Sequence, residues 1–198
     1  MTFLTIYLYF LINYPLSYQV FINKYSKKFN VDPYLVAAII NVESKYDKHA
    51  ISSKDARGLM QIAPITGQWA SEELNIEDFK IDDLFDPELN IMIGAWYLNV
   101  LNQEFNNNFQ LVVAAYNAGS GNVAKWLQND KYSEDGKTLK YIPFPETKEY
   151  VKKVEKNIKI YRILYKDEFE NFVTYNENYL VLLVNNFRKV LKSLIMYK

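Results

Sequence analysis

The residue with the clearest chemical potential is a carboxylate at the end of an apolar segment. Residues 33–43 carry Leu, Val, Ala or Ile at most positions and end at Glu43. A carboxylate in such surroundings loses hydration, and the negative end of a helix opposes its ionisation, so both effects raise its pKa. These are the conditions under which a carboxyl group acts as a general acid near neutral pH. In the alternative interpretation, Glu43 turns outward and pairs with Lys45 or Lys48.

Two short segments place amide and phenol groups beside small residues. Residues 58–62 read Gly-Leu-Met-Gln-Ile, and residues 115–119 read Ala-Tyr-Asn-Ala-Gly. Amides and hydroxyls can hydrogen-bond an acetamido sugar. The chain also has 17 Tyr, 12 Phe and 3 Trp, and aromatic faces suit flat, amphipathic ligands such as sugars. Taken singly, each segment is equally typical of packing and helix capping.

Composition removes several other chemistries. The chain has no Cys and a single His, His49, which lies in a polar stretch and is expected to be solvated. The chain therefore cannot form a disulfide or use a thiol nucleophile, and it lacks the Cys and His ligands of a typical zinc centre. The 23 Lys and Arg equal the 23 Asp and Glu, so no global basic field attracts a nucleic acid. We expect no metal, no cofactor and no nucleic-acid partner.

The segments that must position these groups are predicted to be helices, because strict apolar and polar alternation is rare in the chain. Residues 33–43 are apolar on every face, which predicts a buried central helix. Asp32-Pro33 and Asp86-Pro87 each place a capping carboxylate before a first-turn proline. Further helices are predicted at residues 18–29, 64–74, 87–105, 111–116, 123–127 and 150–165. The 198 residues therefore predict one all-α domain with a sizeable core.

Four blocks in this order resemble the catalytic domain of the Slt-type lytic transglycosylases, which is related to goose-type lysozyme. They are Glu43-Ser44, residues 58–62, residues 115–119 and residues 142–151. The segment from Asp86-Pro87 through Asn90 and Gly94 to Tyr97-Leu98 also resembles the helix that connects these blocks in the family. The resemblance covers about residues 18–165. It implies an all-α, lysozyme-like fold whose buried central helix carries the catalytic Glu.

The resemblance also implies roles for individual residues. Glu43 matches the family's sole catalytic acid and base, and Tyr150 matches the tyrosine whose hydroxyl lies beside it. The matches to substrate-binding positions are Ser44, Ser52, Met60, Gln61, Tyr116, Asn117 and Glu146. Two segments depart from the family pattern: residues 55–57 read Asp-Ala-Arg, and residues 47–48 read Asp-Lys. Neither departure removes a catalytic group.

The implied reaction cleaves the β-1,4 bond between MurNAc and GlcNAc in peptidoglycan glycan strands and forms 1,6-anhydromuramoyl ends. One Glu suffices when the sugar's own 6-hydroxyl is the nucleophile, whereas most glycosidases need two carboxylates. Two alternatives are a hydrolytic muramidase of goose-lysozyme type, or a chitinase-like enzyme, in which a second acid activates water. A further alternative is a non-catalytic glycan-binding scaffold of a cell-wall machine. The last is an all-α nucleic-acid or membrane adaptor that uses the lysines of residues 148–166.

The two ends of the chain are predicted to lie outside the catalytic domain, which is assigned to residues 18–168. Residues 1–17 begin with an uncharged apolar run. They are interpreted as a short export signal or membrane anchor, or as a first helix or strand packed on the domain. Residues 169–198 predict an amphipathic, basic helix that docks on its own domain or on an anionic membrane. We expect an extracytoplasmic monomer, in the cell wall or associated with the membrane.

Overall fold

The fold is helical throughout the part of the chain that the computed structural model describes, namely residues 5, 9–10, 12–166, 169, 181 and 183–187. The helices are α2 (Gln19–Phe29), α3 (Pro33–Glu43), α4 (Pro64–Glu73), the 3-10 helix η1 (Ile81–Phe85), α5 (Pro87–Glu104), α6 (Phe109–Ala118), α7 (Ser120–Leu127) and α8 (Pro145–Leu164). Isolated β-bridges are the sole extended pairing among these residues. The all-α prediction is confirmed.

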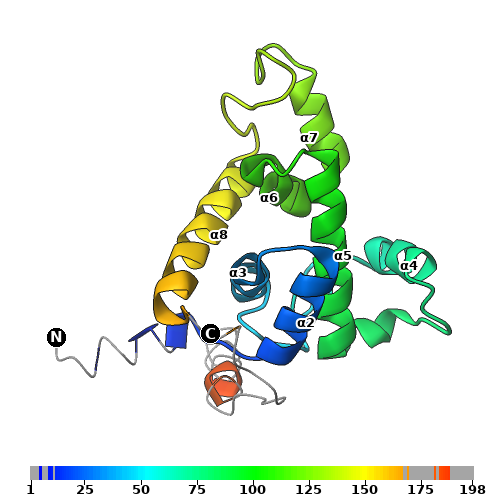
Figure 1. The fold of residues 1–198 in the computed structure, drawn as a ribbon, viewed down its shortest axis with the longest axis vertical. Coiled ribbons are helices and arrows are strands. Elements are labelled where there is room, and N and C mark those ends of the chain that lie inside the picture. The colour runs from blue at the N-terminus through cyan, green and yellow to red at the C-terminus, as the bar shows by residue number, and fades with distance from the viewer. Residues whose placement is uncertain are drawn as a thin grey trace, which may run out of the picture.

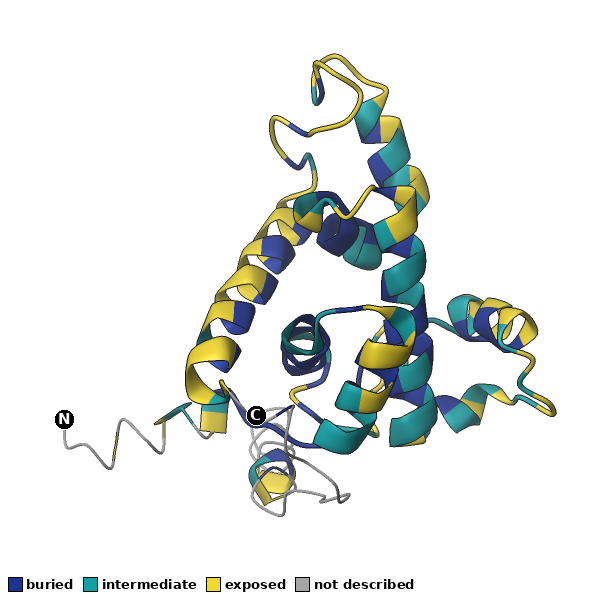
Figure 2. Cartoon of the chain, in the orientation of Figure 1, coloured by how far each residue is buried: buried dark blue, intermediate teal, exposed yellow. Residues whose placement is uncertain are grey.

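Helix α3 lies in the middle of the molecule, with α8 on one side and α5 on the other (Figure 1). It packs most extensively against α8 and also contacts α2 and α5. Residues 35–41 of α3 are all buried, as Figure 2 shows by their dark colour. A helix that is apolar on every face can satisfy all of its faces only in this position. The prediction of a buried central helix is therefore confirmed.

Side-chain caps fix the starts of three helices. Asp32 accepts a hydrogen bond from the Tyr34 backbone N–H at 2.9 Å, and Asp86 accepts one from the Leu89 N–H at 2.8 Å. Asn108 accepts one from the Leu111 N–H at the start of α6. Each cap satisfies a backbone donor that the first helical turn leaves unpaired. Both Asp-Pro predictions are confirmed, while α8 begins at Pro145, five residues before the predicted start.

The chain before α2 is built into the core. Residues 14–18 are buried. The backbone carbonyls of residues 13–15 accept hydrogen bonds from one side chain of α3 and from two tyrosines at the C-terminal end of α8. These bonds run from Asn41 to Asn13 (3.0 Å), from Tyr165 to Tyr14 (2.8 Å) and from Tyr161 to Pro15 (2.6 Å). The folded core therefore includes residues that the sequence analysis assigned to the N-terminal segment.

Of the predicted N-terminal segment, residues 5, 9–10 and 12–17 are described, whereas most of the predicted C-terminal segment, residues 169–198, lies outside the described residues. Within the predicted C-terminal helix, Val181 and residues 183–187 are described and are helical. The Asn185 side chain donates a hydrogen bond to the Lys45 carbonyl, which lies just after α3. In the described part of the chain, no helix has both the length and the apolar character needed to cross a membrane.

Candidate active site

Glu43 is the last residue of α3, and its carboxyl group meets a tyrosine from α8. The Tyr150 hydroxyl donates a hydrogen bond to Oε1 of Glu43 at 2.6 Å. Burial raises the pKa of Glu43 from 4.5 to about 7, although the Tyr150 hydrogen bond acts in the opposite direction. Among the described residues, neither Lys45 nor Lys48 forms an ion pair with Glu43. The interpretation in which Glu43 pairs with a lysine is therefore wrong.

The Glu43 carboxyl faces a cleft of about 450 Å³. Its walls are the loop of residues 52–63, the C-terminal end of α6 and the N-terminal end of α8. The predicted site residues among those lining it are Glu43, Ser52, Gln61, Tyr116, Asn117 and Glu146. Residues from four separate parts of the sequence thus meet in one cleft. Tyr150 is buried behind it and reaches the site through its hydroxyl.

The side chains of Ser52 and Gln61 shape the loop that carries them. The Ser52 hydroxyl accepts hydrogen bonds from the backbone N–H groups of Lys54 and Ala56. The Gln61 amide nitrogen donates to the Ala50 and Gly58 carbonyls at 3.1 and 2.9 Å, at a residue with φ of 51°. Ser52 and Gln61, which are both predicted to contact the sugar, therefore also fix the local backbone.

The departure at residues 55–57 has a structural role. The Arg57 guanidinium pairs with the carboxylates of Asp55 and Asp82, the second of which belongs to η1. The Arg57 backbone also forms bridges with Ile51 and Ile62. The loop is therefore closed on itself and held against η1, so the Asp-Ala-Arg sequence leaves the cleft intact.

Two predicted substrate contacts are not on the cleft wall. The Met60 side chain is fully buried and fills the space beside Gly94, where an added Cβ would lie 2.2 Å from the Met60 sulfur. The Ser44 hydroxyl is buried and donates to the Leu59 carbonyl at 2.7 Å and the Ile40 carbonyl at 3.1 Å. Neither residue is among those that line the cleft, and their contact with substrate stays a prediction. Both side chains hold the loop of residues 58–61 beside the end of α3.

Helix α6 supplies two groups to the cleft, and α8 orients one of them. The Tyr116 hydroxyl donates to the Met60 carbonyl at 2.9 Å, and Thr147 donates to Oδ1 of Asn117 at 2.8 Å. This second bond leaves the Asn117 amide nitrogen available to a ligand. Thr147 was not among the predicted site residues. Its signal was its position three residues before Tyr150, which places both side chains on the same face of a helix.

The electrostatics of the cleft keep both phenols neutral. Burial, together with the nearby Glu43 carboxylate, raises the pKa of Tyr116 and that of Tyr150 well above their usual value. Glu43 and Glu146 are the carboxylates in the described lining, and Glu146 is exposed at the rim. In the described part of the chain, no group of three or more metal-binding side chains occurs. The desolvated Glu43 carboxyl, hydrogen-bonded by a neutral phenol, is suited to proton transfer.

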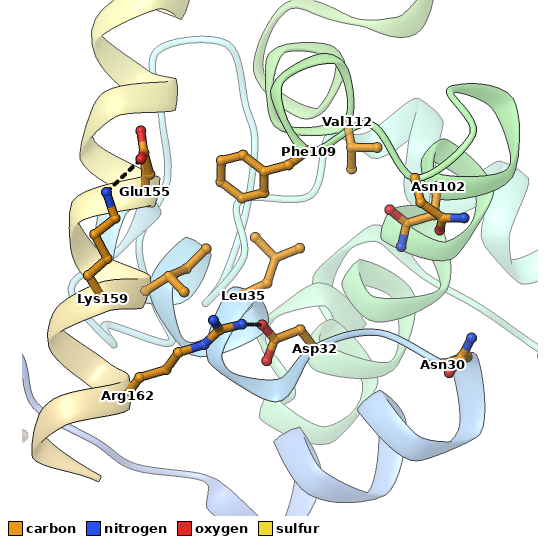
Figure 3. A pocket seen from close by; sticks show the side chains of 11 residues that line it. Asn30, Asp32, Leu35, Asn102, Phe109, Val112, Glu155, Lys159 and Arg162 are labelled. Carbon is orange, nitrogen blue, oxygen red and sulfur yellow. Dashed lines mark hydrogen bonds and ion pairs between the residues drawn. The ribbon is translucent and has the colours of Figure 1, made fainter. Parts of the chain in front are cut away.

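A second cavity has a volume of about 410 Å³. It is lined by the N-terminal parts of α3 and α6 and by the C-terminal half of α8, so it lies away from the ends of these helices that form the cleft. Figure 3 shows Leu35, Phe109 and Val112 inside it, with ion pairs Asp32–Arg162 and Glu155–Lys159 at its edge. Each of these charged groups has a partner of opposite sign. Because both carboxylates in its described lining are ion-paired, this cavity is not the candidate active site.

The fold and the cleft together define a lysozyme-like domain, and solved structures agree. The 70 kDa soluble lytic transglycosylase of Escherichia coli superposes with a TM-score of 0.72 and 32% identity, over 83% of this chain and 27% of that chain. An inactive mutant of the lytic transglycosylase Slt of Pseudomonas aeruginosa gives a TM-score of 0.70 and 30% identity, over 79% and 26% of the two chains. The predicted fold class is confirmed.

The chain belongs to the transglycosylase SLT domain family, whose sequence pattern matches residues 20–139. The soluble lytic murein transglycosylase of Salmonella typhimurium is 37% identical over 143 residues, which are 71% of this chain and 22% of that protein. The membrane-bound lytic murein transglycosylase E of Buchnera aphidicola is 37% identical over 119 residues, 57% of this chain and 56% of that protein. The chain spans about a quarter of the length of the soluble relatives.

Proposed function

We propose that this domain is a lytic transglycosylase that cleaves the β-1,4 bond between MurNAc and GlcNAc in peptidoglycan and leaves 1,6-anhydromuramoyl ends. The observation that carries the proposal is the Glu43 carboxyl, which faces the cleft, has a pKa of about 7 and is held by Tyr150. Such a group carries a proton near neutral pH and can transfer it to a glycosidic oxygen. Relatives named for their action on murein support the substrate class.

The first step is protonation of the leaving group. Glu43 transfers its proton to the glycosidic oxygen while the bond between that oxygen and C1 of MurNAc breaks. The GlcNAc 4-hydroxyl leaves, and the positive charge at C1 is stabilised by the sugar's own N-acetyl group or by the protein. The Asn117 amide nitrogen, freed by the bond from Thr147 to its oxygen, can donate to an acetamido carbonyl in the cleft.

The second step returns the proton to Glu43. Its carboxylate takes the proton of the 6-hydroxyl while that oxygen bonds to C1, so the ring of the anhydro sugar closes. Glu43 ends protonated as it began, and no water is consumed. Tyr150 donates to Oε1 in both steps and thereby keeps the carboxyl oriented. One carboxyl group therefore acts as acid and then as base.

A hydrolytic muramidase is the second candidate, and Glu146 is the observation that favours it. This carboxylate lines the same cleft as Glu43, at the first turn of α8. A second carboxylate with room for water between the two would activate that water. The glycan-binding scaffold is less well supported, because a binder gains nothing from a buried carboxyl group that lowers its stability.

The test is mass spectrometry of muramoyl ends released from purified peptidoglycan. The proposal predicts ends lighter by one water than reducing ends, which are still released by Glu146→Gln and are absent in Glu43→Gln. Reducing ends that disappear in Glu146→Gln would establish hydrolysis instead. No release by a folded protein that still binds glycan would favour the scaffold.

The location of the reaction follows from the substrate. Peptidoglycan lies outside the cytoplasm, so we place this domain there, as a monomer. Relatives of both soluble and membrane-bound kinds are compatible with attachment through the N-terminal or C-terminal segment. Cell fractionation with an antibody to the domain, before and after a high-salt wash, separates membrane attachment from binding to the wall. Recovery of the folded protein in the cytosol would contradict this location.

A further inference from the structure

We infer that Asn90 is a positioning residue for this reaction, because it fixes the substrate-binding turn of residues 58–61 from behind. This inference rests on the proposed function for its catalytic consequence, while the contacts stand on their own. Asn90 lies in the first turn of α5 and is fully buried. Its Oδ1 accepts a hydrogen bond from the Met60 N–H at 2.8 Å. Its Nδ2 donates to the Arg57 carbonyl at 2.9 Å and the Leu84 carbonyl at 2.7 Å.

The turn is packed directly against this amide. Gly58 has φ of 75°, and a Cβ placed on it would lie 2.4 Å from Nδ2 of Asn90 and 2.2 Å from the Leu84 carbonyl oxygen. Glycine is therefore required here both by its backbone conformation and by the close approach. Asn90 belongs to α5, packs against the backbone of Gly58 and bonds Leu84 of η1. It therefore joins the turn to both α5 and η1.

An amide is the one neutral side-chain group that meets all three requirements at this place. The site needs an acceptor for one N–H and two donors for two carbonyls, and the planar amide offers both. A carboxylate keeps the acceptor but loses both donors and places a charge against two carbonyl oxygens. An apolar side chain leaves all three backbone groups without a partner, which is costly in a buried place.

The turn that Asn90 holds carries Gln61, which lines the same cleft as Glu43. From the other side, the Ser44 hydroxyl binds the Leu59 carbonyl, and Tyr116 binds the Met60 carbonyl. Ser44 directly follows Glu43, so a shift of the turn changes the distance between the general acid and the Gln61 side of the cleft. A displacement of about 1 Å can lower a rate by roughly 100-fold. Asn90 thus acts on the reaction through Gln61 and does not touch substrate itself.

The test compares two buried asparagines in the full chain, on a soluble glycan-strand substrate. Asn90→Ala is expected to lower kcat/KM by roughly 100-fold. Asn157→Ala, which removes a buried amide on α8 that bonds Asn41 and the Lys153 carbonyl, is expected to change it less than about threefold once stability is matched. Equal losses in the two variants, at equal folded fraction, would overturn the inference.

A double-mutant cycle with Gln61→Ala separates positioning from loss of stability. If Asn90 acts through the turn, Gln61→Ala lowers kcat/KM strongly in the parent and only slightly in the Asn90→Ala background. Independent effects that multiply would contradict the inference. Where Asn90→Ala does not fold, Asn90→Ser, which is neutral and keeps one donor and an acceptor, serves in the same cycle.

A readout that needs no activity distinguishes failure of this inference from failure of the proposed function. Hydrogen exchange of the Met60 amide, followed by NMR, is expected to become at least about tenfold faster in Asn90→Ala and to stay unchanged in Asn157→Ala. Unchanged exchange in both variants would refute the contact. Faster exchange in a protein whose parent releases no anhydro ends would leave the contact standing and refute the proposed function.

Discussion

The two ends of α3 carry two carboxylates in opposite surroundings. At the N-terminal end, Asp32 accepts the Tyr34 N–H and pairs with Arg162. At the C-terminal end, Glu43 has the Tyr150 hydroxyl as its partner and no cation paired with it among the described residues. The helix dipole favours a negative charge at the first end and opposes it at the second. One carboxylate therefore stabilises the helix, and the other is kept ready to hold a proton.

This difference shows how the fold separates stability from chemistry. The cavity beside Asp32 has ion pairs at its edge, whereas in the other cleft the partner of Glu43 is the neutral phenol of Tyr150, and the charged lining residues Lys54 and Glu146 are exposed. A neighbouring cation would lower the pKa of Glu43 and make it a carboxylate at neutral pH. Because no cation is paired with Glu43 among the described residues, burial is the dominant effect on its pKa.

Removing the acid should have the largest effect. Glu43→Gln keeps the size of the side chain and an acceptor for Tyr150 but cannot transfer a proton, so we expect a loss of at least about 1,000-fold in kcat. Asp32→Asn is the matched change at the other end, and kcat should stay within about threefold of the parent. Rates of anhydro-end release measure both. Comparable losses in the two variants would show that the ends do not differ in the way described.

The same substitution should reveal the stability lost to the buried acid. The pKa of Glu43 is 4.5 as a reference value and about 7 in the fold, so the folded state holds a proton that the unfolded state releases between these values. Its contribution to stability is therefore complete below pH 4.5 and is lost as the pH rises toward 7. Because the residue is half-buried, we expect Glu43→Gln to be more stable than the parent by roughly 2 kcal/mol at pH 8.

Urea denaturation at pH 4 and pH 8 measures this difference. At pH 4 the two proteins should have nearly the same free energy of unfolding, since Glu43 is protonated in both states. A stability difference that does not change with pH would mean that the carboxyl of Glu43 is not shifted by the fold.

Removing the partner of Glu43 should have a moderate effect. Tyr150→Phe deletes the hydroxyl that orients Oε1 and that lowers the pKa of Glu43. We expect a loss of about tenfold in kcat, and the alkaline limb of the pH–rate profile should move to higher pH. A limb that moves to lower pH would contradict the direction assigned to this hydrogen bond.

The smallest effect is expected at the stabilising end. Asp32→Ala removes the cap of α3 and its ion pair with the exposed Arg162, so the free energy of unfolding should fall by about 1 kcal/mol. Thermal or urea denaturation measures it, and kcat at a temperature where the variant is folded should match the parent. A tenfold loss of kcat would show that the two ends are coupled.

The parts of the fold that depend on local pattern were predictable. Apolar residues on every face placed α3 in the core, and the Asp-Pro pairs located the starts of α3 and α5. The place of Glu43 at the end of that helix predicted a raised pKa, but an outward-turned Glu43 paired with Lys45 or Lys48 was equally compatible with the position alone. Its contact with Tyr150, 107 positions away, required the family resemblance, because spacing in the sequence cannot specify a tertiary contact.

The parts that depend on side-chain bonds to distant backbone groups were not predictable. Ser44 and Met60 were expected in the cleft, but their polar and apolar groups are satisfied inside the protein. Asn90 was noted only as part of the segment that resembles the family's connecting helix, since a buried amide shows its purpose only when its three backbone partners are known. The same holds for the segment before α2, whose carbonyls meet tyrosines from the far end of the domain.

Direct titration of the Glu43 carboxyl tests the central claim most directly. NMR of protein labelled with ¹³C at the glutamate side chains, with Glu43→Gln to assign the resonance, gives the pKa of this group without any assay. The structure predicts a value near 7, and the alkaline limb of the pH–rate profile should have its midpoint at the same pH. A value near 4.5 would contradict the account, because Glu43 would then be a charged carboxylate at neutral pH and could not serve as the acid.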